Sequence, residues 1–103
     1  MRRYYVYMLL CADDSFYVGI TNDPERRLAE HNAGIDEECY TYARRPVTIV
    51  HCSDFGEVWD ALRWEKRLKG WSRAKKRALT LNDWPAICEI VRAERKSRER
   101  RRC

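Results

Sequence analysis

The sequence predicts an α+β domain in which a small three-stranded antiparallel sheet is flanked by helices, in the order strand-strand-helix-strand-helix-helix-helix. Two apolar and aromatic runs, 4–10 and 16–20, are joined by a short link, which favours an antiparallel hairpin. A third, β-branched run follows Pro46 and extends from Val47 towards Cys52. A chain of 103 residues with 45% apolar content supports one core rather than two.

The first half of the chain carries clear turn and helix signals. Residues 12–15 contain Asp and Ser side chains that can bond nearby backbone groups and stabilise a reversal. Gly19 lies in the second strand, where a missing side chain often marks the close approach of another group, here expected beside Tyr17. The first helix is expected over 24–33, because capping side chains and a proline precede it and Gly34 can end it.

The first helix carries two candidate functional residues, an arginine and a histidine. Arg27 and His31 are four residues apart, so they share one face and flank a narrow apolar stripe. From helix position alone, they would be a solvated arginine and a surface histidine. The loop that follows, 35–45, contains Tyr40-Thr41-Tyr42. We expect these residues to cover the edge of the core; contact with a substrate is the weaker alternative.

Three more helices are expected after the third strand. Residues 54–57 can form a capping box that starts a helix over about 57–69. Gly70 ends that helix, and Ser72 can cap the next one, which runs to about Leu81. A last helix is expected to begin at Asn82 or Asp83 and to run towards Arg95. Four tryptophans are concentrated in this half, most of them as packing residues, and one of them could stack on a base.

Glu65 has an unusual position in the 57–69 helix. It falls in line with the apolar stripe formed by Val58, Ala61, Leu62 and Leu68. A carboxylate there is costly unless it is paired or bound to a cation. The sequence leaves two readings of Glu65: a salt bridge, for example to Arg27, or a metal ligand that faces the helix of Arg27 and His31.

The basic residues are unevenly distributed. The net charge is +5, yet residues 63–77 hold eight basic residues and one acid, and residues 92–103 hold seven basic residues and two acids. The remainder of the chain is therefore acidic, with a balance of −7. Such asymmetry indicates a side that faces a polyanion, most simply nucleic acid. For 98–103 a solvated, disordered tail is the simpler reading.

The cysteines and the hydropathy of the sequence indicate the cellular compartment in which we expect the protein. The five cysteines are scattered without the spacing of a zinc or redox motif, which favours reduced thiols. No apolar run approaches the roughly 20 residues needed to span a bilayer. These features, with a strand almost at the start of the chain, predict a cytoplasmic protein without a signal peptide.

Residues 4–80 resemble the GIY-YIG nuclease domain, and the small stand-alone bacterial members in particular. Tyr5-Val6-Tyr7 stands in place of the first motif and Tyr17-Val18-Gly19 in place of the second. Gly19-Ile20-Thr21 follows the family pattern, and Arg44 to Val47 is like an Arg-Arg-Pro-Val stretch in those small proteins. The first motif departs from the family at Tyr5, which replaces a glycine. The residues that carry the resemblance are Tyr7, Tyr17, Gly19, Arg27, His31 and Glu65.

The resemblance implies a metal-dependent endonuclease that hydrolyses phosphodiester bonds in DNA. It implies that Glu65 holds one divalent cation, Mg²⁺ or Mn²⁺, and that Arg27 neutralises charge on the phosphate. Tyr7 would orient or deprotonate the water, and Tyr17 and His31 would assist, with His31 itself a possible base. Nucleic acid would contact the basic segment beside this site. The residues expected to contact it are Arg63, Lys66, Lys69, Arg73, Lys75 and Lys76.

The expected organisation is a nuclease-like domain over 1–81, a helix over 82–97 that packs on it, and a basic tail over 98–103. A single domain of this family could need a protein partner for specificity and could be a monomer or weak dimer. One alternative is a non-catalytic nucleic-acid-binding module that retains the fold. A weaker alternative is a structural protein that pairs through its tryptophan-rich helices. The resemblance and the pattern both select Glu65, which favours the nuclease.

Overall fold

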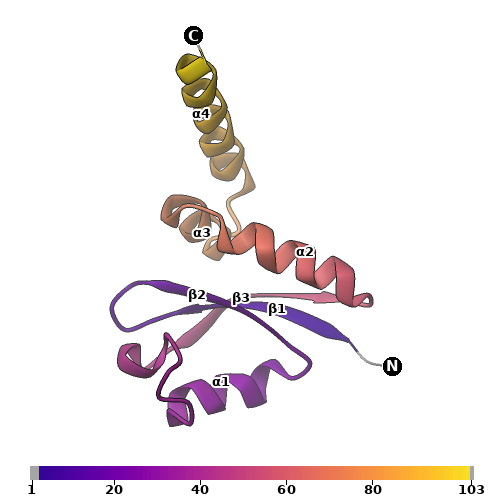
Figure 1. Cartoon of the computed structure of the whole chain (residues 1–103), viewed down its shortest axis with the longest axis vertical. Helices are drawn as coiled ribbons and strands as arrows, with labels where there is room; N and C mark the ends of the chain where they lie inside the picture. The colour runs from indigo at the N-terminus through magenta and orange to yellow at the C-terminus, as the bar shows by residue number, and fades with distance from the viewer. Residues whose placement is uncertain (1–2, 103) are drawn as a thin grey trace. The chain divides into compact units, whose positions relative to one another are not determined.

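The computed structural model describes the backbone of residues 3–102 and the side chains of residues 3–97 (Figure 1). The predicted order of elements and the α+β class are confirmed. The elements are β1 (Tyr4–Leu10), β2 (Phe16–Thr21), α1 (Pro24–Ala33), a short 3-10 helix (Tyr42–Arg44), β3 (Thr48–Phe55), α2 (Val58–Lys69), α3 (Arg73–Thr80) and α4 (Trp84–Arg102).

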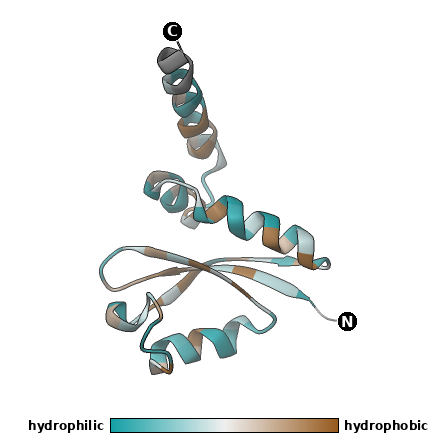
Figure 2. Ribbon diagram, in the orientation of Figure 1, coloured by the Kyte–Doolittle hydropathy of each residue, from teal (hydrophilic) through white to brown (hydrophobic). Residues whose placement is uncertain are grey.

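The sheet is antiparallel, with β1 in the centre and the order β2-β1-β3. Helices α1 and α2 lie on opposite sides of it (Figure 1). Because both faces are covered, four consecutive β1 residues, 6–9, are buried, which explains why this strand is continuously apolar rather than alternating. Figure 2 shows the hydrophobic colour concentrated on the strands, whereas α1 is largely hydrophilic.

The turn between β1 and β2 forms as its sequence predicts. The Asp13 carboxylate accepts hydrogen bonds from the Ser15 backbone N–H at 3.1 Å and from the Ser15 hydroxyl at 2.5 Å. Asp14 takes a left-handed conformation with φ 65°, which aspartate tolerates better than most residues. The other Asp13 oxygen accepts from Arg44 at 3.0 Å, which joins the turn to the loop before β3.

Helix α1 begins and ends where its capping residues predict. Asp23 accepts a hydrogen bond from the Arg26 backbone N–H at 3.2 Å, and Pro24 occupies the first turn. Gly34 ends the helix with φ 66°, a left-handed conformation that glycine adopts at little cost. These caps set the ends of the helix and therefore the direction in which Arg27 and His31 project.

The capping box predicted over 54–57 does not form. Strand β3 extends to Phe55, so Asp54 lies within the sheet opposite Tyr5 rather than at a helix start. Its carboxylate instead pairs with Arg3 at 2.6 Å. Glu57 occupies the cap position of α2 without a side-chain hydrogen bond. Long-range strand pairing has overridden a local capping pattern.

The chain divides into two compact units, 1–70 and 71–103. The boundary between these two units falls at Gly70, the residue that ends α2. In the second unit α3 and α4 pack together, and Lys75 joins them by an ion pair with Glu94 at 3.0 Å. Lys75 also lies over the Trp71 ring, 5.4 Å from its centroid.

Helix α4 differs from the expected C-terminal segment. It continues to Arg102, whereas the sequence predicted a helix that ended by residue 97 and a disordered basic tail over 98–103. Local helix propensity accounts for the difference, because 98–102 consists of Arg and Glu, which are good helix formers. Cys103 lies outside the described residues. Among those residues, no helix combines the length and apolar character that crossing a bilayer requires.

Candidate functional site

The site is built on β1 and β2, where Tyr7 stands opposite Gly19. A Cβ atom at position 19 would lie 2.5 Å from the Tyr7 hydroxyl oxygen and 2.6 Å from Tyr7 Cζ, closer than real side chains approach. The Tyr7 ring therefore crosses the space that a side chain at 19 would occupy. From the sequence, Gly19 was expected to allow close packing beside Tyr17. In the structure, the side chain that needs this space is that of Tyr7.

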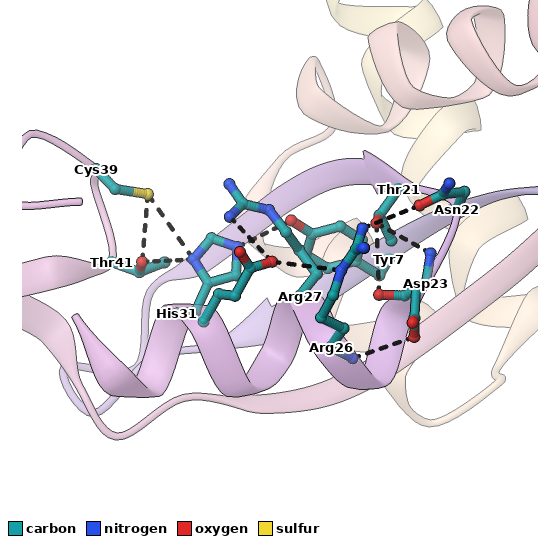
Figure 3. Close-up of polar contacts among 10 residues, drawn as sticks. Tyr7, Thr21, Asn22, Asp23, Arg26, Arg27, His31, Cys39 and Thr41 are labelled. Atoms are coloured by element: carbon teal, nitrogen blue, oxygen red, sulfur yellow. Dashed lines mark hydrogen bonds and ion pairs between the residues drawn. The ribbon is translucent and has the colours of Figure 1, made fainter. Parts of the chain in front are cut away.

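A continuous chain of hydrogen bonds runs from the sheet through α1 to the loop that follows it (Figure 3). The Tyr7 hydroxyl lies 2.9 Å from His31 Nε2, and His31 Nδ1 lies 2.8 Å from the Thr41 hydroxyl. All three residues are buried, with exposed fractions of 1% for Tyr7, 4% for His31 and 1% for Thr41. His31 is thus a core residue with both ring nitrogens bonded, which corrects the surface reading from helix position.

Tyr17 and Cys39 complete the surroundings of His31. The Tyr17 ring meets the His31 ring edge-on at a centroid distance of 5.1 Å, and it lies 6.3 Å from the Tyr7 ring. Cys39 Sγ lies 3.4 Å from the Thr41 hydroxyl and 3.8 Å from His31 Nδ1. The two family tyrosines and the histidine therefore meet in one cluster, as the resemblance implied.

The loop over 35–47 is held against α1 by side-chain bonds to its backbone. The Asn32 side chain accepts from the Val47 N–H at 2.8 Å and donates to the Val47 carbonyl at 2.9 Å. Arg44 donates to the Tyr40 carbonyl at 2.8 Å and stacks over the Tyr40 ring. These contacts bring Thr41 to His31. Sequence reasoning missed this role of Thr41, because a threonine between two loop tyrosines carries no periodic signal.

Arg27 is on the same face of α1 as His31, but it is partly open to solvent. Its side chain is 31% exposed and lies 3.9 Å from the Glu30 carboxylate. Burial lowers the pKa of Arg27, while Tyr7 and Glu30 raise it by more, so the net shift is upward. Arg27 therefore presents a permanent positive charge at the rim of the tyrosine cluster. It also lines a small hollow with His31, Cys39 and Thr41.

The protonation states inside the cluster follow from its burial. Burial raises the pKa of Tyr7 above its ordinary value, the neighbouring Tyr17 adds to the rise, and Arg27 offsets only part of it. Burial and the Arg27 charge lower the pKa of His31. At neutral pH, Tyr7 is consequently a neutral phenol and His31 a neutral imidazole. A neutral imidazole can accept a proton through one nitrogen while the other donates.

Glu65 is not in contact with this cluster. Its carboxylate pairs with Lys69 at 2.7 Å, one turn along α2, and its side chain is 15% exposed. The pairing partner is therefore a lysine of its own helix rather than Arg27. Because the sheet separates α2 from α1 (Figure 1), Glu65 does not face the first helix across a shared layer, contrary to the sequence expectation.

The link between the two layers lies at the β2 edge of the sheet. Burial raises the pKa of Tyr17, and among the charges that oppose this rise are those of Arg27 and Lys69. Tyr17 is thus within electrostatic reach of a cation from α1 and a cation from α2. The same lysine, Lys69, is the ion-pair partner of Glu65.

The side chains around the site are compatible with a divalent cation that prefers oxygen ligands. No group of three or more His, Cys, Asp or Glu side chains suited to a metal occurs among the described residues. A closed all-protein site such as structural zinc does not match this arrangement. Mg²⁺ and Mn²⁺ can instead use one carboxylate, retain several waters and take further oxygens from a phosphate. Glu65, partly exposed, can supply such a single carboxylate.

The predicted nucleic-acid contacts are not equivalent. Lys75 is 8% exposed and paired with Glu94, so it supports the α3–α4 packing rather than presenting a charge at the surface. Lys69 is paired with Glu65, and Arg63 lies 3.4 Å from Asp60. The remaining three, Lys66, Arg73 and the half-buried Lys76, have no ion pair among the described side chains.

Comparison with known proteins shows the family to which the chain belongs. Residues 3–78 match the model of the GIY-YIG catalytic domain. The chain belongs to the GIY-YIG catalytic domain family, whose members include nucleases.

Small relatives share most of this chain. It is 47% identical over 76 residues to a UPF0213 protein of Halobacterium salinarum, an alignment that covers 74% of this chain and 97% of the relative. A UPF0213 protein of Bacillus pumilus is 45% identical, with 72% of this chain and 74% of the relative covered. The solution structure of a UPF0213 protein from Bacillus halodurans is similar with a TM-score of 0.51 at 38% identity, over 82% of this chain and 90% of that one.

Proposed function

We propose that the protein is an endonuclease that hydrolyses phosphodiester bonds in DNA with the help of one divalent cation. The observation that carries this proposal is the buried chain from Tyr7 through His31 to Thr41, with Arg27 beside it. Burying three connected polar side chains contributes little to stability compared with an apolar core. Their arrangement does suit the transfer of a proton away from an attacking water.

The proton transfer can be assigned to specific atoms. Tyr7 alone is a poor base, because its raised pKa keeps the phenol protonated at neutral pH. As the water attacks phosphorus, its proton passes to the Tyr7 oxygen while the Tyr7 proton passes to His31 Nε2, 2.9 Å away. The required tautomer places the other imidazole proton on Nδ1, donated to Thr41 at 2.8 Å. His31 is the final acceptor in this scheme.

The remaining residues act on charge and orientation. Arg27 binds the scissile phosphate and neutralises the charge that develops on its equatorial oxygens. Tyr17, which is edge-on to His31, keeps the imidazole oriented and borders the water position. The bond from phosphorus to the leaving sugar oxygen breaks as the bond from the water oxygen to phosphorus forms, and the leaving oxygen then takes a proton from solvent.

Glu65 would hold the cation, with Lys69 as its partner when no cation is bound. When bound, Mg²⁺ or Mn²⁺ supplies a positive charge that stabilises phosphate and leaving-group oxygens. Exchange of a lysine for a cation requires no new buried charge, since the carboxylate is partly exposed. The preferred substrate is DNA because the resemblance implies it, and RNA belongs in the same test.

The test is cleavage of a panel of single-stranded, duplex, branched and flap DNA, with RNA alongside, in Mg²⁺, in Mn²⁺ and in chelator. Two matched pairs of variants accompany it. Arg27→Ala is expected to slow cleavage by roughly 10²- to 10³-fold, whereas Arg26→Ala, the neighbouring arginine that also pairs with Glu30, retains it. Glu65→Gln is expected to lose metal-dependent cleavage, and Glu57→Gln, which changes an exposed acid just before the same helix, is expected to retain it.

The outcomes separate the candidate functions. Metal-dependent cleavage lost in Arg27→Ala and Glu65→Gln supports the nuclease. If Arg27→Ala and Glu65→Gln cleaved at the wild-type rate, the proposed active site would be wrong. Binding on every substrate without cleavage would identify instead the nucleic-acid-binding module, or an enzyme that needs a protein partner. Sedimentation of the wild type establishes whether it is a monomer or weak dimer.

A further inference from the structure

The two compact units carry opposite charge. Residues 1–70 contain ten basic and twelve acidic residues, a balance of −2, although they include all five proposed catalytic residues. Residues 71–103 contain eleven basic and four acidic residues, a balance of +7. The unit with the candidate chemistry is therefore acidic overall, which opposes its association with a polyanion. The attraction must come largely from the second unit.

Within the second unit, α4 has one packing face and one charged face. Ile87 is buried, and Glu94 is partly buried through its pair with Lys75. Arg92, Arg95 and Lys96 are exposed. Their spacing of three and four residues places them on one side of the helix. Helix α4 continues to Arg102 with four further arginines in its sequence over 98–102.

Helix α4 lies outside the family domain. The domain matches residues 3–78, whereas α4 begins at Trp84. The alignment with the Halobacterium relative is 76 residues long and covers 97% of that protein. That relative is therefore too short to contain an equivalent of α4 as well. The helix is thus an addition to a domain that some relatives have without it, and its composition supplies the charge that the first unit lacks.

We propose that the basic face of α4, defined by Arg92, Arg95 and Lys96, is a nucleic-acid anchor that binds the phosphate backbone without reading sequence. This inference deepens the proposed function and rests on it. A regular helix with cations on one side can track a phosphate backbone. Arginine is suited to this role because its guanidinium can bond a phosphate bidentately.

The exposed residues of α4 favour nucleic acid over a membrane surface. An interfacial membrane helix combines basic residues with large apolar side chains that enter the bilayer. Trp84, at the start of α4, is 47% exposed, but beyond Cys88 the described part of α4 exposes no large apolar side chain. The exposed residues there are Glu89, Arg92, Ala93, Arg95, Lys96 and Ser97.

The test is the salt dependence of duplex DNA binding by the full chain, measured in chelator so that no cleavage occurs. A triple variant, Arg92→Gln, Arg95→Gln and Lys96→Gln, removes three charges with little change in helix propensity. Affinity is expected to fall about tenfold or more, and the slope of log K against log salt to flatten by roughly 2 to 3. The matched control, Arg92→Lys, Arg95→Lys and Lys96→Arg, keeps all charges and is expected to bind like wild type.

Other outcomes overturn the inference. Wild-type DNA affinity in the glutamine triple would show that α4 is not the anchor. Loss of binding to phosphatidylglycerol vesicles, with DNA affinity retained, would assign the face to a membrane instead. If both triple variants lost DNA affinity equally and circular dichroism showed less helix, these residues would be needed for folding rather than for binding. Because binding is measured without metal, failure of the proposed cleavage chemistry leaves this test intact.

Discussion

The two faces of the sheet are buried to a similar degree but differ in chemistry. On the α1 face, Tyr7, His31 and Thr41 form a chain of hydrogen bonds among side chains less than 5% exposed. By strand alternation, Val6 and Met8 point to the opposite face, which α2 covers. Both are fully buried apolar residues, as are Ala61 and Leu68 of α2.

This difference separates packing from chemistry within one strand. The α2 face is what an antiparallel sheet needs to fold, because it removes apolar surface from water. The α1 face also has an apolar cluster, which includes Leu9, Cys11 and Val47, but it buries polar groups as well. These must all be satisfied, and each loss leaves an unpaired group behind. Such an arrangement is favourable for function rather than for stability, so adjacent β1 residues should respond differently to substitution.

The largest contrast is expected between Tyr7 and Met8. Tyr7→Phe removes the hydroxyl that joins the proposed water to His31, and cleavage should fall by roughly 10²- to 10⁴-fold. Met8→Ala creates a cavity on the other face and should lower the free energy of unfolding by about 2 to 5 kcal/mol. Urea unfolding and cleavage per folded molecule measure the two effects. Equal loss of cleavage in folded Met8→Ala would contradict the division between faces.

A smaller effect on stability is expected for Gly19→Ala. The added Cβ would lie 2.5 Å from the Tyr7 hydroxyl oxygen, so the ring must move away from His31. Overpacking of this kind costs about 1 to 3 kcal/mol, and cleavage should fall because the hydrogen bond at 2.9 Å is lost. Gly56→Ala is a matched control, since nothing lies within 4 Å of a Cβ there. If Gly19→Ala cleaved and unfolded like Gly56→Ala, the close approach would not matter.

The smallest effect is the pH dependence of stability through the two histidines. Burial lowers the pKa of both His31 and His51 in the folded protein. Below about pH 6.5 the unfolded chain therefore binds more protons, so the free energy of unfolding is greatest above this pH and decreases as pH falls. Urea unfolding across this range should show a shallower decrease in His31→Gln and in His51→Gln. Only His31→Gln should also lose cleavage, and an unchanged pH dependence in both variants would refute the assignment.

Much of the fold could be predicted because its signals are local. Asp23, Pro24 and Gly34 define α1 through contacts within a few residues, and the β1 and β2 runs are separated by a readable turn. The capping prediction over 54–57 was wrong because strand pairing carried β3 to Phe55. The helix boundary near 97 was also wrong, since α4 continues to Arg102.

For the site, the sequence alone identified the residue types, and the family spacing selected Tyr7, Tyr17, Arg27, His31 and Glu65. Only the tertiary structure decided which of them touch. Pairing of β1 with β2 put Tyr7 over Gly19, and the loop after α1 brought Thr41 to His31. Helix α2, which carries Glu65, lies on the other side of the sheet from α1, and the partner of Glu65 is Lys69. Contacts between residues far apart in sequence depend on the packing of whole elements, which no local pattern encodes.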